Sequence, residues 1–389
     1  MASEKIALAT LFTGIGAAEF AAHEVFAEYD MAFACEIDKF ARQSYLVNHA
    51  IDEKHFHRDI KELDAKAYAS KVDILIGGSP CQDFSLAGLR AGTDGERGEL
   101  IYEFVRIVDE CKPRIFIYEN VKGFLSIGRG RAYTEFKMAL RDLGYYIHDG
   151  VLNTKDYGIA QNRERIYIVG FLDFNEYLNF DFAPRVPLTT AIKDYLDDEV
   201  DEKYYLNEDA ILSMVEPNAC FNGKFDPKET DECAGTIKTS GGTRRTDNFI
   251  KVAGRLDIKG NEMIRRVYDD SGSAPTLNTC GGGGQTPKIL QAARGFNKGY
   301  ELEICPTISS SGFERNNTLD EGYRIRKLTP REYLRLQGFP KNFKIVCSDT
   351  QTYKQAGNAM SVNVVAMILR QIQKIKEGVS DSLFAKAAV

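Results

Sequence analysis

The chain has 389 residues, 43% of them hydrophobic, which is enough for one large domain or two medium ones. No apolar run approaches the roughly 18 residues that a membrane-spanning helix needs, and Met1–Lys5 lacks the pattern of a signal peptide, so a cytoplasmic location is expected. The net charge of −6, taken alone, argues against binding to nucleic acid.

Strand-like and helix-like segments alternate from residue 6 to residue 171. The expected strands are 6–12, 31–35, 72–76, 114–118 and 165–171, and the expected helices are 17–28, 38–49, 99–111 and 131–143. This alternation predicts an α/β domain with a mostly parallel sheet and helices on both faces.

The alternation stops between residues 184 and 320, where Gly, Ser and Thr are frequent. Three weak repeats, 233–242, 274–283 and 305–312, suggest short strands that end in glycine loops. Residues 171–232 carry 5 Lys and Arg against 16 Asp and Glu, whereas residues 233–340 carry 17 against 11. The basic stretch is either a solvated, loop-rich region or a surface for nucleic acid.

The α/β pattern returns near the end of the chain. Thr329 and Pro330 have the positions of a helix cap and a first helical residue, and residues 362–375 have the spacing of an amphipathic helix that packs on the first domain. The expected organisation is a catalytic domain (1–185), an inserted β-rich domain (186–325), a return segment (326–378) and a flexible tail (379–389).

Cys81 follows a buried strand, a glycine turn and Pro80. Open α/β sheets bind their ligands at the carboxyl ends of strands, and the proline stiffens the chain there. These features favour a nucleophilic thiol. The alternative is a buried cysteine that acts as a small hydrophobic residue.

A second glycine turn, with Gly14 and Gly16, follows the first expected strand, and Glu36 ends the next one. Glycines let a ligand approach the backbone, and an acid at this distance can hold ribose hydroxyls. The third glycine of a dinucleotide fingerprint is absent, which argues against a nicotinamide cofactor. Asp59 is placed to accept a proton from an adenine amino group. An ordinary βα turn remains the alternative.

Further polar residues stand at the ends of later strands. Glu119 is placed for general acid work or for capping the next helix. Arg163 and Arg165, two apart on an extended segment, share a face and could fix a base carbonyl and a phosphate, or form a surface salt-bridge cluster. The segment 355–359 could return to the first domain and close the cofactor pocket.

Together these segments resemble the DNA (cytosine-5)-methyltransferases of bacteria and their phages. The resemblance rests on Leu11-Phe-Thr-Gly-Ile-Gly, Glu36-Ile-Asp-Lys, Gly78-Ser-Pro-Cys-Gln, Glu119-Asn-Val, Gln161-Asn-Arg-Glu-Arg, Leu328-Thr-Pro-Arg-Glu-Tyr-Leu-Arg-Leu-Gln-Gly-Phe-Pro and Gln355-Ala-Gly-Asn, which occur in the family's order. Ser79 stands where proline is commoner, and Ile37 stands where many members have tryptophan. The second departure is expected to loosen packing on adenine.

The resemblance implies a Rossmann-like S-adenosylmethionine-dependent methyltransferase domain with an inserted target-recognition domain. It implies a reaction in which the Cys81 thiolate adds to C6 of a flipped cytosine. Glu119 then holds or protonates N3, Arg165 contacts the base carbonyl, and C5 takes the methyl group, leaving S-adenosylhomocysteine. Arg163 and Gln82 complete the implied catalytic set, and no metal is required.

The resemblance also assigns the cofactor pocket and the partners. The pocket residues are Phe12, Thr13, Gly14, Gly16, Glu36, Ile37, Asp59, Ile60, Pro80, Leu100, Asn358 and Ala359. Expected contacts to double-stranded DNA are Arg244, Arg245, Arg265, Arg266 and Arg315. A monomer is implied, and a separate cognate restriction endonuclease is left open. The alternatives are a transfer-RNA cytosine methyltransferase of the same fold and a catalytically silent DNA-binding protein.

Overall fold

The computed structural model describes residues 5–80, 99–204, 252–255, 266–269, 288–292 and 323–378. Within these ranges, no helix is both long enough and apolar enough to cross a membrane. For the strands between residues 252 and 327, the structure describes the backbone alone.

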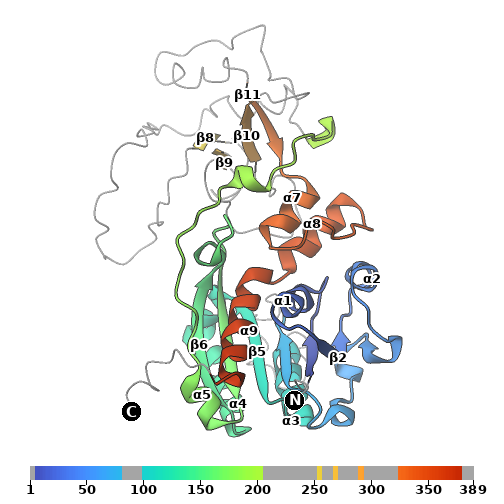
Figure 1. The fold of residues 1–389 in the computed structure, drawn as a ribbon, viewed down its shortest axis with the longest axis vertical. Coiled ribbons are helices and arrows are strands. Elements are labelled where there is room, and N and C mark those ends of the chain that lie inside the picture. Colours follow the sequence, from blue (N-terminus) through green and yellow to red (C-terminus); the bar gives the residue numbers. More distant parts are fainter. Residues whose placement is uncertain are drawn as a thin grey trace, which may run out of the picture.

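A seven-stranded sheet forms the centre of the molecule, in the order β3-β2-β1-β4-β5-β7-β6 (Figure 1). The first five strands in this order are parallel, and β7 is antiparallel to both of its neighbours. The strands are β1 (Ile6–Leu11), β2 (Tyr29–Cys35), β3 (Phe56–His57), β4 (Ile74–Gly77), β5 (Ile115–Val121), β6 (Tyr146–Asn153) and β7 (Glu164–Phe171). The predicted mostly parallel α/β sheet is confirmed.

Helices cover both faces of this sheet, as Figure 1 shows. They are α1 (Ala17–Val25), α2 (Lys39–Asn48), α3 (Glu99–Cys111), α4 (Arg131–Asp142), α5 (Phe174–Asn179), α7 (Pro330–Leu336), α8 (Asp349–Asn358) and α9 (Val362–Lys376). Short 3₁₀ segments are η1 (Glu53–His55), η2 (Ile60–Glu62), η3 (Ala65–Tyr68), η5 (Lys122–Gly130), η6 (Thr154–Tyr157), η7 (Ile192–Tyr195) and η8 (Glu202–Tyr204).

Strand alternation divides the apolar side chains between two cores. In β4, Ile74 and Ile76 join the core beneath α1 and α9, whereas Leu75 joins the core beneath α3 and α4. A strand that is buried on both faces reads as a continuous apolar run, which is how this segment appears in the sequence.

The amphipathic helix expected near the C-terminus is α9, and it packs against α1 as predicted. Thr329 caps α7, and its side chain and that of Glu332 form a capping box with Pro330 at the helix start. The helix expected over 17–28 ends earlier, at Val25, because Phe26 is extended.

Two of the elements that the sequence did not predict are β6 and α8, and α5 is another. The strand β6 contains Asp149 and Gly150, residue types that strands disfavour. Asp149 is accommodated because Tyr133 and Lys137 of α4 both contact its carboxylate. The second missed element is α8, whose end contains glycine and asparagine and which was read only as the approach to the last helix.

A separate four-stranded sheet has the order β11-β10-β9-β8. Its strands are β8 (Val252–Arg255), β9 (Arg266–Asp269), β10 (Lys288–Ala292) and β11 (Tyr323–Lys327), and β11 leads into the segment that carries α7. The strands β8, β9 and β10 lie within the predicted insertion, whereas β11 runs past its predicted end at residue 325; the boundaries of the insertion remain predictions.

Candidate active site

The first part of the site is the glycine turn after β1. Phe12, Gly14 and Gly16 all have positive φ angles, of 52°, 58° and 86°, and a side chain at Gly14 would meet no atom within 4 Å. The turn therefore exposes open backbone at the carboxyl end of the central strand, where a ligand can approach closely.

Glu36 follows β2 and faces this turn. One carboxylate oxygen accepts a hydrogen bond from the backbone N–H of Gly14 at 2.8 Å, and the other accepts from the N–H of Asp38 at 2.8 Å. Burial raises the pKa of Glu36, although the backbone N–H groups oppose the shift. A half-buried carboxylate at a strand end is a suitable acceptor for the hydroxyl groups of a sugar.

Two further pocket residues lie beside Glu36. Ile37 is 64% exposed, although it is a large apolar residue. Asp59 follows β3, which pairs with β2, and Glu36 donates its backbone N–H to His57 at 3.1 Å. Burial, followed by the charges of Glu36 and Asp59, raises the pKa of the Cys35 thiol to about 12.

A buried carboxylate beneath the glycine turn was not identified from the sequence. Glu19, only 1% exposed, accepts hydrogen bonds from the hydroxyls of Thr10 at 2.7 Å, Thr13 at 2.9 Å and Tyr45 at 3.0 Å. These bonds tie β1, the turn, α1 and α2 together. A glutamate on a helix ordinarily indicates an exposed position, so no sequence signal pointed to this role.

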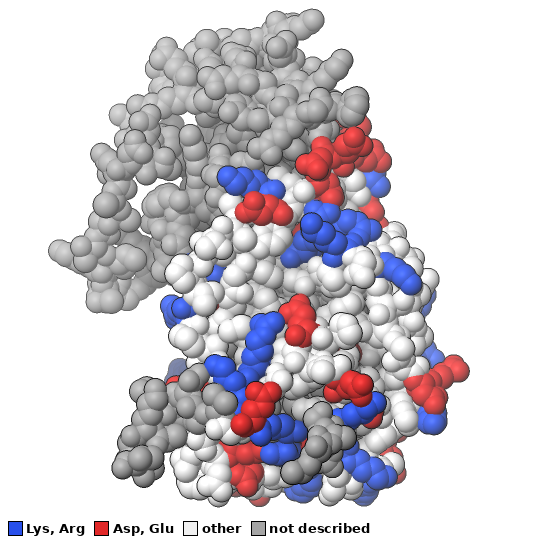
Figure 2. All heavy atoms as spheres, in the orientation of Figure 1, with Lys and Arg blue, Asp and Glu red and all other residues white. Residues whose placement is uncertain are grey.

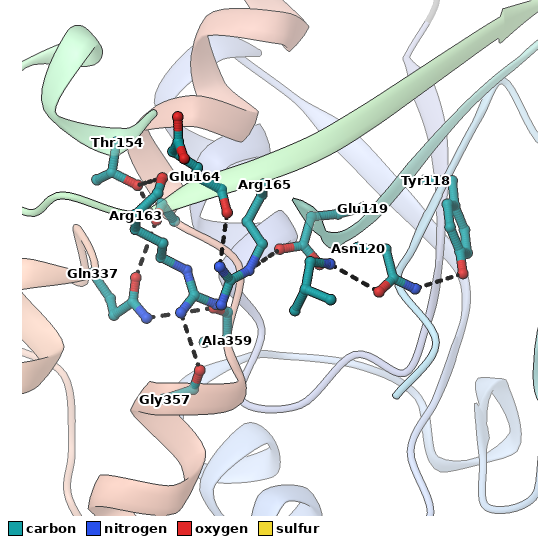
Figure 3. Close-up of polar contacts among 12 residues, drawn as sticks. Tyr118, Glu119, Asn120, Thr154, Arg163, Glu164, Arg165, Gln337, Gly357 and Ala359 are labelled. Atoms are coloured by element: carbon teal, nitrogen blue, oxygen red, sulfur yellow. Dashed lines mark hydrogen bonds and ion pairs between the residues drawn. The ribbon is translucent and has the colours of Figure 1, made fainter. Parts of the chain in front are cut away.

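The second part of the site is the pair formed by Glu119 and Arg165. Glu119 lies within β5 rather than after it, and Arg165 lies on β7, one diagonal step across the antiparallel pair. Arg165 Nε is 3.2 Å from Glu119 Oε1, and both side chains are largely buried (Figure 3). Burial raises the pKa of Glu119, and the charges of Arg165 and Arg163 only partly oppose this shift.

Arg163 occupies a different environment from the one expected. It is 2% exposed, and its guanidinium donates to the backbone carbonyls of Gly357 at 3.3 Å and Ala359 at 2.8 Å. Figure 3 shows its guanidinium beside that of Arg165, as the spacing predicted. Burial, then the charge of Arg165, lowers the pKa of Arg163 to about 9, so it is still charged at neutral pH. Its burial leaves no room for the phosphate contact that the sequence suggested.

The residue after β4, Gly78, lies directly beside Glu119 of the neighbouring strand β5. A Cβ atom at Gly78 would lie 2.7 Å from the Glu119 carbonyl oxygen and 3.1 Å from Glu119 Oε2, so only glycine fits there. The next residues are Ser79 and Pro80. The predicted catalytic residues Cys81 and Gln82 lie outside the described residues.

The remaining predicted pocket residues have diverse environments. Asn358 is exposed at the end of α8, Ala359 and Ile60 are buried, Pro80 is exposed and Leu100 is half-buried. The arginines expected to contact DNA all have side chains outside the described part of the structure. They are Arg244, Arg245, Arg265, Arg266 and Arg315. The described residues contain no group of three His, Cys, Asp or Glu that could hold a metal ion.

Comparison with known proteins gives a consistent result across the chain. A family model described as C-5 cytosine-specific DNA methylase matches residues 6–374. The orphan methyltransferase M.SPRI of Bacillus phage SPR is 31% identical, with 95% of this chain and 97% of the relative covered. The type II methyltransferase M.SsoII of Shigella sonnei is 33% identical, with 93% of this chain and 78% of the relative covered.

Solved structures with the same fold have lower sequence identity. The methyltransferase EhMeth of Entamoeba histolytica has a TM-score of 0.66 and 17% identity, covering 96% of this chain and 99% of that one. The Dnmt2 methyltransferase of S. pombe has a TM-score of 0.64 and 19% identity, covering 96% and 99%. At these identities the likeness establishes the fold.

Proposed function

Because the chain belongs to the C-5 cytosine-specific DNA methylase family, we propose that it methylates C5 of a flipped cytosine at a specific sequence in duplex DNA. The main support for the proposal is the largely buried pair of Glu119 and Arg165. Glu119 lies directly beside Gly78, the residue that follows β4. Cys81 follows the end of β4 in the sequence by four residues, so the proposed nucleophile belongs to the same edge of the sheet.

The proposed cofactor is S-adenosylmethionine, which the glycine turn and its neighbours fit. Glu36 is a half-buried acceptor suited to the ribose, Ile37 offers an exposed apolar surface for adenine, and Asp59 is a second acceptor nearby. Asn358, exposed at the end of α8, would close the pocket. When bound, this cofactor supplies the methyl group that C5 takes up.

The proposed chemistry on the base is nucleophilic catalysis. The Cys81 thiolate forms a bond to C6, the electron pair of the C5–C6 double bond shifts to C4–C5, and that of the C4–N3 double bond shifts to N3. N3 accepts the proton of Glu119, whose pKa is raised by burial, and Arg165 offers N–H donors to the base carbonyl, so the resulting enamine is nucleophilic at C5. Once C5 carries the methyl group and S-adenosylhomocysteine is left, a base takes the C5 proton, the C5–C6 double bond re-forms as the C6–S bond breaks, and N3 returns its proton to Glu119.

Arg163 has a positioning role in this proposal. It touches the carbonyls on both sides of Asn358 and lies beside Arg165, so it links the two halves of the site. A planar guanidinium can hold two acceptors at once, which a lysine cannot do with the same geometry.

Contact with the DNA backbone is proposed for the basic surface around α7 and α8. Figure 2 shows lysine and arginine side chains gathered over these helices. Exposed lysines in this part of the chain include Lys341, Lys344 and Lys354, and such groups suit phosphate contacts. The insertion at 186–325 is the proposed target-recognition domain.

The test is base-resolution bisulfite sequencing of a plasmid from cells that express the protein, with Cys81→Ala as the matched control. Cytosines protected in one short sequence context, and unprotected in the control, are the expected result. Incubation with duplex DNA and with RNA distinguishes the transfer-RNA alternative, because only DNA should accept the methyl group. Methylation of RNA alone would overturn the proposal.

The covalent step has its own test. A duplex with 5-fluorocytosine at the target should form a stable adduct with the wild-type protein, because fluorine cannot leave C5 as a cation. Cys81→Ala should bind the same duplex without forming the adduct. A protein that methylates DNA but forms no adduct would contradict this mechanism.

A further inference from the structure

A buried hydroxyl group of β5, that of Tyr118, is hydrogen-bonded to the segment that follows β4. Ser79 Oγ and Tyr118 Oη share a hydrogen bond of 2.7 Å, and Asn120 Nδ2 donates to the same Tyr118 oxygen at 2.9 Å. Asn120 Nδ2 also lies 3.3 Å from the backbone carbonyl oxygen of Ser79, to which it donates. Two side chains of β5, those of Tyr118 and Asn120, thus hold Ser79, which precedes Cys81 by two residues; Figure 3 shows the contact between Tyr118 and Asn120.

Nothing about packing alone requires a hydroxyl at this position. Tyr118 is fully buried, and its ring packs against Phe104 at 4.8 Å and Phe136 at 4.6 Å between ring centroids. A phenylalanine would fill the same space. A phenolic hydroxyl in an apolar core costs stability unless it is hydrogen-bonded, and here its partners belong to the segment that leads to the predicted nucleophile.

The backbone just before this segment is also confined. Gly78 lies against the Glu119 carbonyl so closely that a Cβ atom there would be 2.7 Å from that oxygen. The segment is therefore held by three consecutive residues of β5: the Glu119 backbone lies against Gly78, and the Tyr118 and Asn120 side chains are hydrogen-bonded to Ser79.

We propose that Tyr118, through Ser79, is a positioning residue for Cys81. This inference rests on the proposed function, since it takes Cys81 as the nucleophile. Tyr118 touches neither substrate nor cofactor in this role. It holds Ser79 and Pro80 so that the thiol of the following residue reaches the base at the geometry required for attack, and small displacements of reacting groups slow such steps strongly.

The test compares two tyrosines in the same core. Tyr118→Phe removes the hydroxyl that holds Ser79. Tyr145→Phe removes an equally buried hydroxyl that donates to the Pro113 carbonyl at 2.7 Å, at the opposite end of β5. Each variant removes one buried hydroxyl group, which has two hydrogen-bond partners in Tyr118 and one in Tyr145. Thermal unfolding of both variants measures the general destabilisation, and only the first variant should affect the thiol.

The first readout is the single-turnover rate of adduct formation with the 5-fluorocytosine duplex. Tyr118→Phe should slow it about 10-fold to 100-fold, Tyr145→Phe should leave it unchanged, and the KM for S-adenosylmethionine should be unchanged in both. Ser79→Ala should slow it similarly, and the double variant should be no slower than either single variant. Equal rates in Tyr118→Phe and the wild type would overturn the inference.

The second readout does not depend on activity. Amide hydrogen exchange in the peptide that contains Ser79 and Cys81 should be faster in Tyr118→Phe than in Tyr145→Phe or the wild type. Unchanged exchange there would overturn the inference even if activity fell. A wild-type protein that forms no adduct would instead contradict the proposed function, while the exchange comparison would still decide whether Tyr118 holds the segment.

Discussion

Buried charge distinguishes individual residues of this site from ordinary core and surface positions. Glu36, Glu119 and Arg163 are all withdrawn from water, and burial is the largest cause of the pKa shift in each. Such groups cost stability, and functional sites are where proteins retain them. The polar partners in each case are backbone groups or charges of opposite sign.

Replacing Glu119 by glutamine should separate stability from activity. The folded-state pKa of Glu119 is raised, so its stabilising contribution is present below its ordinary pKa and is lost as pH rises through the raised value. Glu119→Gln, a neutral side chain of the same shape, should therefore have a higher Tm than the wild type at about pH 8 and a smaller advantage at about pH 5.

The activity of the same variant should fall about 100-fold or more, because the amide cannot transfer a proton to N3. Thermal unfolding at both pH values and methyl transfer to plasmid DNA measure the two effects. Glu164→Gln is the matched control, since Glu164 pairs with Lys122 on the exposed face and should change little. A Glu119→Gln variant with full activity would contradict the role of Glu119 as proton donor.

The exposed side chain of Ile37 gives a gain-of-affinity prediction. Ile37→Trp should lower the KM for S-adenosylmethionine about 3-fold to 10-fold, because a ring can stack on adenine. Because Ile37 is 64% exposed, the change should not disturb the core. Leu46→Trp, at another exposed apolar position (51%), is the control. The same KM in Ile37→Trp and the wild type would show that position 37 does not contact adenine.

At the scale of secondary-structure elements, the pairing of β5 with β7 assembles the base-contacting side of the site. The strands are antiparallel with Glu119 opposite Tyr167 and Val121 opposite Arg165. Because side chains alternate along a strand, Arg165 faces the same side as Glu119, while Glu164 faces away and pairs with Lys122. A slip of one residue in this register would move Arg165 to the opposite face.

Because Gly78 lies so close to the backbone of β5, we expect a severe effect of Gly78→Ala. The added methyl group would meet a backbone carbonyl, which cannot move aside without displacing β5. Methyl transfer should fall about 100-fold and the Tm should drop. Gly123→Ala is the control, because the nearest atom to its Cβ, Val121 Cγ2, is 3.9 Å away. Wild-type activity in Gly78→Ala would exclude this close contact.

At the scale of the whole molecule, the C-terminal segment completes a site that begins near the N-terminus. Gln337 donates to the Ala356 carbonyl at 2.7 Å and accepts from Ser361 at 3.1 Å, and Ser361 is hydrogen-bonded to Thr154 at 2.7 Å. Gln161 also donates to Gln337 at 3.2 Å. This buried network joins the region before β7 to the turn between α8 and α9, where Asn358 lies.

Arg163 is the charged member of this long-range connection. Arg163→Lys should raise the KM for S-adenosylmethionine about 10-fold, because the single nitrogen of lysine cannot replace the two guanidinium nitrogens that bond the Gly357 and Ala359 carbonyls. Initial-rate kinetics with varied cofactor measure this change. Arg370→Lys, which alters an exposed pair with Glu24, should have no effect. A fall in kcat with unchanged KM would place Arg163 at the base instead.

Most elements of the catalytic domain and their order could be predicted from the sequence alone. Apolar periodicity located β1, β4, α3 and α9, and the motifs placed Gly14, Glu36, Glu119 and Arg165 at or near strand ends. These features are local, since they depend on residues a few positions apart. The capping box at Thr329 is of the same kind.

Only the tertiary structure decided which strand ends meet and which side chains are buried. The antiparallel insertion of β7 between β5 and β6 brings Glu119 to Arg165, and no local pattern encodes that pairing. Burial of Arg163 and Glu19 depends likewise on segments far along the chain, because polar residue types are read as exposed until their partners are known. Local periodicity specifies an element, whereas long-range packing and hydrogen bonding specify a site.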